Sequence, residues 1–290
     1  MTHAVVEKVS DTAFGIAHCR AVETERSDAL FHDPLAKVLA GERGKEIAAA
    51  MPMPFMVEQI VVIRTCVIDG YIRMAIDQGA DTVVNLGAGL DTRPYRLDLP
   101  NSLRWIEADY PDVIEFKEKR LSGEKPRCQL ERVQLDLADV AERQKLLVRV
   151  GGQAKKTFVL TEGVISYWSV EEVGSLADDL KALGQSCYWV VDYFSSEVVK
   201  YRQRSRIGRK MRNAPFKFAA TDWLGFFREH GWRPKEIRYL AEEAERLHRP
   251  IQLPVLLKLT IGVRNFFATK ERQANRKRYL GYAILEPALG

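Results

Sequence analysis

The sequence predicts an α/β fold built around an open, mostly parallel β-sheet. Short apolar runs alternate with helical patterns along the middle of the chain, an order typical of strands that pair in parallel through right-handed crossovers. Two runs, Val83-Val84 and Trp189-Val190-Val191, are continuously apolar, as strands buried on both faces are. A Gly-x-Gly segment follows the first of them, where open α/β sheets bind ligands.

The N-terminal part of the chain has a helical pattern. Residues 11–50 are interrupted at Phe31-His32-Asp33-Pro34, because the residue before a proline disfavours helical geometry. After a second break at 51–54, apolar residues recur at three- and four-residue spacing and predict a long helix that ends near Gly79. Arg64 falls within that apolar stripe.

The remaining elements follow from the same patterns. We expect strands over 82–86, 103–108, 131–135, 157–160 and 188–193, with helices over 111–121, 139–149 and 170–183. Beyond residue 194 we expect a basic helix over 197–213, a helix over 221–230 with Thr221 as its N-cap, and late strands over 235–240 and 282–285.

Composition indicates an ordinary globular protein. Of the 290 residues, 46% are hydrophobic and 29% charged, and with no internal repeat we expect a single domain over 1–290. Helical cap elements would span about 1–55 and 196–220, around a core at about 56–195. The net charge of +5 is too mild to demand a nucleic-acid partner, and the basic run at 197–213 is more typical of a solvated helix.

Targeting and metal signals are missing from the sequence. The four cysteines have no metal-site spacing, so no metal is expected. Residues 1–10 lack the apolar core of a secretory signal. The apolar stretch 251–267 is interrupted by charged residues, so it is too short and too polar to span a bilayer. We therefore expect a cytoplasmic protein without a membrane partner; the sequence leaves its oligomeric state open.

The sharpest chemical signal is the segment around Gly87-Ala88-Gly89. Glycines let a backbone approach a cofactor closely, although the same pattern also occurs as a plain turn. Glu107 and Asp109 end the next strand, where a carboxylate can accept hydrogen bonds from ribose hydroxyls. The alternative for Asp109 is an N-cap of the following helix.

Two adenosine cofactors fit this pattern. Dinucleotide sites carry Gly or Ala at the sixth position of Gly-x-Gly-x-x-Gly, whereas Thr92 stands here, followed by Arg93-Pro94. This difference favours S-adenosylmethionine, which has no phosphate. Arg64 would suit its carboxylate, because a guanidinium on an apolar helix face needs a partner; an acid of the protein is an equal alternative.

Two later strand ends add acids to the same edge. An acid at Asp136-Leu137 can meet an adenine amino group, and Glu162 can face an amine or a sulfonium. Each also has an ordinary alternative as a helix cap or a solvated loop residue.

With these motifs in order, the sequence resembles a known family. The resemblance covers about residues 12–240 and rests on Arg64-Thr65…Ile68-Asp69, Asn85-Leu86-Gly87-Ala88-Gly89-Leu90-Asp91-Thr92-Arg93, Glu107-Ala108-Asp109-Tyr110-Pro111, Asp136-Leu137 and Glu162-Gly163-Val164…Tyr167. The chain resembles the leucine carboxyl methyltransferases, and more closely their bacterial branch with polyketide O-methyltransferases of the tetracenomycin type. The resemblance implies a class I methyltransferase fold: a Rossmann-like three-layer sandwich with a seven-stranded, mostly parallel sheet, N-terminal helices and an inserted helical lid.

The resemblance also implies roles for individual residues. Arg64 would bind the methionine carboxylate, and Gly87 would contact the methionine portion. Asp109 would hold the ribose, Asp136 and Leu137 would frame the adenine, and Glu162 would contact the amino group. Ala88 and Gly89 would also belong to the cofactor site. Tyr167 would reach toward the acceptor, and Arg20 matches an amine-bearing residue of relatives. The expected cofactor is S-adenosyl-L-methionine and the expected partner is a small-molecule acceptor.

The expected reaction is O-methyl transfer to a carboxylate or phenolic hydroxyl, with polyketide-like secondary metabolites among the candidate acceptors. None of the five histidines stands in a recognisable base position, which favours a carboxylate, or a phenol activated by a cation. Candidates to line the acceptor pocket are Phe14, Phe55, Met56, Tyr167, Trp168, Phe216 and Phe218. An NAD(P)-dependent oxidoreductase and a non-catalytic cofactor-binding protein of the same fold remain alternatives.

Overall fold

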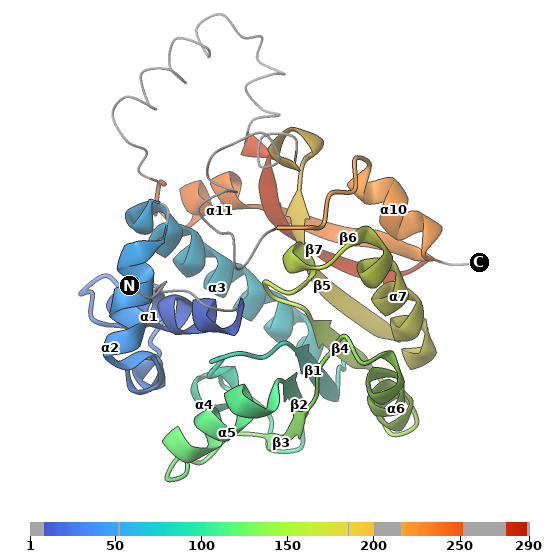
Figure 1. Ribbon diagram of the computed structural model, residues 1–290, viewed down its shortest axis with the longest axis horizontal. Helices are drawn as coiled ribbons and strands as arrows, with labels where there is room; N and C mark the ends of the chain where they lie inside the picture. Colours follow the sequence, from blue (N-terminus) through green and yellow to red (C-terminus); the bar gives the residue numbers. More distant parts are fainter. Residues whose placement is uncertain (1–8, 52, 185, 200–215, 252–276, 289–290) are drawn as a thin grey trace, which may run out of the picture.

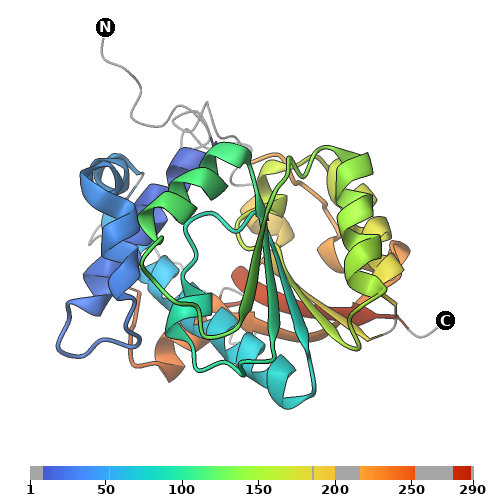
Figure 2. The same ribbon diagram turned by 90° about the horizontal axis from the view of Figure 1, so that it is seen from below.

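Seven strands form one twisted sheet with helices on both faces in the computed structural model (Figures 1 and 2), which describes residues 9–51, 53–184, 186–199, 216–251 and 277–288. The strand order is β3-β2-β1-β4-β5-β7-β6. The strands are β1 (Thr82–Leu86), β2 (Arg104–Asp109), β3 (Gln129–Gln134), β4 (Thr157–Leu160), β5 (Cys187–Phe194), β6 (Trp232–Tyr239) and β7 (Leu280–Pro287). Strands β1 to β5 pair in parallel, while β7 runs antiparallel between β5 and β6.

The longer helices follow the predicted order, whereas the short helices α4 and α11 were not predicted. They are α1 (Thr12–Thr24), α2 (Pro34–Ala50), α3 (Pro54–Asp77), α4 (Arg93–Arg96), α5 (Pro111–Arg120), α6 (Val140–Gly151), α7 (Val170–Leu180), α10 (Trp223–Glu229) and α11 (Leu240–Arg246). The expected break before Pro34 is present: Asp33 caps α2 by accepting a hydrogen bond from the Ala36 amide at 3.1 Å.

Each face of the sheet carries its own core. Alternate residues of a strand point to opposite faces, so Val84 packs with α6, α7 and α10, whereas Val83 packs with α3 and α11. Both residues are fully buried. The continuous apolar run of β1 thus reflects burial on both sides, as expected for a central parallel strand.

The predicted fold class is confirmed, and most differences are at element ends. Strands 82–86 and 157–160 coincide with β1 and β4. The N-cap expected at Thr221 is wrong: Asp222 caps α10 by accepting from the Gly225 amide at 2.9 Å. Most of the predicted helix over 197–213, and nearly all of the apolar stretch 251–267, lie outside the described residues.

Within the described ranges, no group of side chains could hold a metal ion. In those ranges no single helix is long and apolar enough to cross a membrane; α2 and α3 pass that test of length and composition only as a pair, bent by 119°.

Candidate functional site

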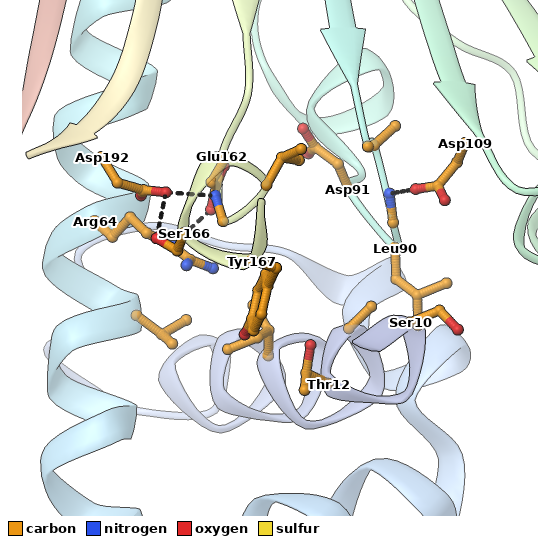
Figure 3. Close-up of a pocket in the computed structure, with 18 of the residues that line it drawn as sticks. Ser10, Thr12, Arg64, Leu90, Asp91, Asp109, Glu162, Ser166, Tyr167 and Asp192 are labelled. Atoms are coloured by element: carbon orange, nitrogen blue, oxygen red, sulfur yellow. Dashed lines mark hydrogen bonds and ion pairs between the residues drawn. The ribbon is translucent and has the colours of Figure 1, made fainter. Parts of the chain in front are cut away.

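A cavity of about 980 Å³ opens at the carboxyl ends of the parallel strands (Figure 3). The loops after β1, β2 and β4 form one side, and α1 with the first turns of α3 forms the other. The structure brings most of the sequence-predicted site residues to this one cavity: Arg64, Gly87, Ala88, Gly89, Asp109, Leu137, Glu162 and Tyr167.

The turn after β1 leaves its backbone open to the cavity. Gly87 has φ +72° and Gly89 has φ +47°, a region that L side chains rarely adopt. A Cβ on Gly87 would lie 2.4 Å from Cγ2 of Val164, so only glycine fits there. The Gly87 amide donates to the carbonyl oxygen of Ala108 at 2.8 Å, which holds the turn against β2.

Asp109 at the end of β2 fixes the same turn. Its Oδ2 accepts from the Gly89 amide at 2.6 Å, and its Oδ1 accepts from the Tyr110 amide at 2.7 Å. Burial raises the pKa of the Asp109 carboxyl. The N-cap position of α5 belongs to Tyr110, so Asp109 serves the glycine turn and the cavity rather than capping the helix.

Glu107, the other acid of β2, is not part of the site. Its carboxylate is fully buried, 2.8 Å from Nζ of Lys117 and 3.0 Å from Nε of Arg132. The expectation that an acid of this strand meets a ribose can therefore apply only to Asp109, which lines the cavity. The sequence could not separate them, because residues two apart on a strand share a face.

The loop after β3 contributes through its apolar residue. Leu137 is buried and lines the cavity, as does Ala138. Asp136 is exposed, accepts from the Ala138 amide at 2.9 Å and is not among the lining residues. It lies at the rim beside Tyr110, where burial, with Asp136 as a further cause, raises the pKa of the phenol.

Arg64 and Glu162 lie next to each other in the wall of the cavity (Figure 3). Nε of Arg64 lies 2.7 Å from Oε1 of Glu162, and Nη1 of Arg93 lies 2.8 Å from Oε2. Burial alone would raise the pKa of Glu162, but the two arginines outweigh it and lower that pKa. The protein-acid alternative for Arg64 is thus present, while the guanidinium still lines the cavity.

The pair is the end of a buried charge chain that the sequence reading missed. Arg93 also contacts Asp91 at 2.8 Å and Asp69 at 2.7 Å. Arg96 contacts Asp69 at 2.6 Å and lies 3.7 Å from Asp33.

The other end of the chain is Arg20, on α1. Its Nε lies 2.8 Å from Asp33, and its Nη2 donates to the carbonyl oxygen of Leu90 at 2.6 Å. Arg20 lines the cavity as well. The only signal of the chain in the sequence was the charge density of Asp91-Thr92-Arg93 and Asp33, without any indication of pairing.

Aromatic side chains form the apolar part of the cavity. Tyr167 stacks on Phe216 with ring centroids 5.2 Å apart and an interplanar angle of 18°, and both line the cavity with Trp168. Other aromatic candidates lie elsewhere: Phe14 packs on Phe116, Phe218 packs on Phe226 in the core, and Phe55 is exposed. Met56 is not among the lining residues.

Asp192, near the end of β5, was not predicted. It is 5% exposed, lines the cavity, and accepts from the Gly163 amide at 3.1 Å and from Oγ of Ser166 at 3.4 Å (Figure 3). An acid directly after the apolar run Trp189-Val190-Val191 was the available signal.

The sheet order, the glycine turn after β1 and the acid that ends β2 define the class I methyltransferase fold. Two solved structures share it: a protein of Thermobifida fusca YX provisionally described as a methyltransferase (TM-score 0.58, 13% identity, covering 99% of this chain and 97% of that one), and a DUF574 family protein of Streptomyces avermitilis (TM-score 0.56, 14% identity, 98% of both chains). At such identities they support the fold alone.

The family comes from the sequence comparisons. Residues 13–181 match the leucine carboxyl methyltransferase model, so the chain belongs to this family. A relative in Parafrankia sp. is 33% identical over 272 residues (85% of this chain, 84% of the relative), and one in Mycobacterium marinum is 34% identical over 230 residues (71% and 72%). Both are provisionally named S-adenosyl-L-methionine-dependent methyltransferases. The predicted family, cofactor and general activity are thereby confirmed, and the nicotinamide alternative is set aside.

Proposed function

We propose that this protein transfers the methyl group of S-adenosylmethionine to an oxygen of a small, largely apolar molecule, either a carboxylate or a phenol. The observation that carries the proposal is the joining of two unlike halves in one cavity. Polar strand ends form one half, and Tyr167, Trp168 and Phe216 contribute to the other. The volume of about 980 Å³ lies at the upper end of the range for small-molecule sites, which leaves room for an acceptor beside the cofactor.

The polar half fits the cofactor. Gly87 lines the cavity without a side chain of its own, which matches a close approach by the methionine portion, with Ala88 and Gly89 continuing the contact. Asp109 is placed to accept from the ribose, since each of its oxygens keeps a lone pair beyond its backbone bond.

The two ends of the cofactor would meet the flanking residues. We assign the adenine to Leu137, with Asp136 at the rim, the carboxylate to Arg64 and the ammonium to Glu162. Nε of Arg64 is buried and, among the described residues, has an ion-pair neighbour but no aligned hydrogen-bond acceptor. A ligand carboxylate would supply one.

The bound cofactor supplies an activated methyl group on a sulfonium, so the chain's own task is to hold the acceptor and to exclude water. Tyr167 is the residue we propose to orient it, because its ring stacks on Phe216 at the cavity wall. No histidine of the described residues lines the cavity. A carboxylate acceptor, ionised at neutral pH, needs no base, whereas Lys217 at the rim could lower the pKa of a phenol.

Binding and turnover test this proposal separately. Calorimetry should show binding of S-adenosylmethionine and not of NAD. Incubation with aromatic carboxylic acids, matching phenols and their pre-methylated counterparts, read by mass spectrometry, should show methylation of the free acids or phenols alone. Cofactor binding without turnover on either set would favour the non-catalytic alternative, and polyketide-like phenols in the panel test that narrower substrate class.

Tyr167→Phe and Phe216→Ala probe the acceptor half. Loss of the stacking partner in Phe216→Ala should raise KM for the acceptor while leaving cofactor affinity unchanged. Tyr167→Phe keeps the stacking and removes only the hydroxyl, so it separates ring packing from a polar contact. Equal losses of cofactor and acceptor affinity in both variants would contradict the assignment of this half to the acceptor.

A further inference from the structure

Eight charged side chains form one buried chain that alternates in sign and has both ends at the cavity. Seven of them follow one another in the order Arg20, Asp33, Arg96, Asp69, Arg93, Glu162 and Arg64, and Asp91 is a side branch that pairs with Arg93. None of these side chains is more than 15% exposed. The four arginines balance the four acids, so the cluster as a whole is neutral.

The two contacts of Glu162 are not equivalent. Arg93 donates an aligned hydrogen bond from Nη1 to Oε2 at 2.8 Å. Arg64 lies as close to Oε1, at 2.7 Å, but its Nε makes no aligned hydrogen bond. The bond from Arg93 is therefore the stronger geometric constraint on the carboxylate, and the contact with Arg64 is the one that can open at lower cost.

A ligand with a zwitterionic end can enter between Arg64 and Glu162 without changing the net charge of the cluster. The carboxylate of the ligand would pair with Arg64, and its ammonium would pair with Glu162. Separating a buried pair without such replacement would leave uncompensated charge, which is strongly destabilising. During the exchange Glu162 still needs a cation that stays in place, and Arg93 is the residue with that geometry.

We propose that Arg93 is a positioning residue that holds Glu162 at the cavity wall while Arg64 exchanges this carboxylate for the amino-acid end of the cofactor. The inference rests on the proposed function, because it assumes an amino-acid-bearing ligand at this wall. Arg93 itself is anchored by Asp69 and Asp91, so its guanidinium cannot follow Arg64. Arg93 also lines the cavity, but in this proposal it acts through Glu162 and makes no contact with the methyl acceptor.

The test compares two ligands that differ at the amino-acid end. S-adenosylhomocysteine carries that end, and 5′-methylthioadenosine lacks it while keeping the adenosine and the sulfur. In Arg93→Lys the charge remains, but a single ammonium cannot bridge three acids as the guanidinium fork does. We expect calorimetric affinity for S-adenosylhomocysteine to fall by about tenfold or more, with the affinity for 5′-methylthioadenosine nearly unchanged.

Arg96→Lys is the matched control. Arg96 is on the same short helix, is as buried, and shares Asp69 with Arg93, but it does not touch Glu162. It should lower the melting temperature to a similar extent without changing the ratio of the two affinities. Equal losses for both ligands in Arg93→Lys, matching those of Arg96→Lys, would reduce Arg93 to a structural role and overturn the inference.

A crystal structure of the wild-type protein with S-adenosylhomocysteine keeps the test independent of variant folding. It should show the contact from Arg93 to Glu162 retained and Arg64 bound to the ligand carboxylate. Retention of the Arg64–Glu162 contact with the ligand carboxylate elsewhere would refute the exchange while leaving the proposed function intact. A wild-type protein that binds neither ligand would refute both.

Discussion

The buried pair of Lys117 and Glu107 offers a quantitative test of how much one buried ion pair contributes to the free energy of unfolding. Both side chains are fully buried, and their charged atoms are 2.8 Å apart. Lys117→Met removes the cation but keeps the length of the side chain. Loss of one partner of a buried ion pair costs about 3–5 kcal/mol, and because Arg132 still contacts Glu107 at 3.0 Å we expect about 3 kcal/mol.

Urea unfolding of wild type, Lys117→Met, Glu107→Gln and the double variant measures this energy. The double variant should recover much of the loss, because no unpaired carboxylate remains buried in it. Lys119→Met, an exposed change on the same helix, should alter the free energy of unfolding by no more than about 0.5 kcal/mol. A cost below about 1 kcal/mol for Lys117→Met would refute the reasoning.

The same double variant tests the assignment of the two acids of β2. Among the described residues, Glu107 forms ion pairs with Lys117 and Arg132, and it does not line the cavity. The double variant should therefore bind S-adenosylhomocysteine as well as wild type does, within about threefold. A loss comparable to that of an Asp109 variant would show that Glu107 supports the cofactor site after all.

Four further outcomes follow from the geometry. Gly87→Ala should abolish cofactor binding in calorimetry and destabilise the fold by about 1–3 kcal/mol, since its Cβ would lie 2.4 Å from Val164; unchanged binding would contradict the assignment of the glycine turn after β1 to the cofactor. Arg64→Ala should weaken S-adenosylhomocysteine binding by about 1.5–3 kcal/mol, and an unchanged dissociation constant would remove Arg64 from the site. The pKa of Glu162 is held below its ordinary 4.5 despite burial, so its stabilising contribution is present above that value and is lost as pH falls through the lowered pKa. The difference in urea midpoint between wild type and Glu162→Gln should therefore stay constant down to about pH 5 and shrink in more acidic buffer. Tyr167→Phe should keep cofactor affinity in the same titration, and a large loss would place Tyr167 in the cofactor half.

Much of the fold was predictable because local pattern and tertiary environment agree. The apolar runs of β1 and β4 are buried on both faces, so their sequence limits match their structural limits. The N-cap of α10 was misplaced by one residue because Thr221 and Asp222 are both good caps, and only the backbone decides between them.

The candidate site was predictable to the extent that parallel strands end at one edge. This rule placed Gly87, Asp109 and Glu162 together. It could not show that Glu107 pairs with a buried lysine, because that contact depends on how α5 packs against β2. It could not show that Arg64 meets Glu162 either, because these two residues lie on elements distant in sequence. The charge chain was missed for the same reason.

The position of β7 has a consequence for the order in which the protein assembles. This strand follows β6 in the chain but lies between β5 and β6, and Tyr282 within it lines the cavity. During synthesis, β1 to β5 can pair as soon as they emerge, whereas β6 has no sheet neighbour until β7 is made. The pocket wall is thus finished by a late, long-range step of the kind that slows folding, and a nascent chain stalled before β7 would present an unprotected edge on β5.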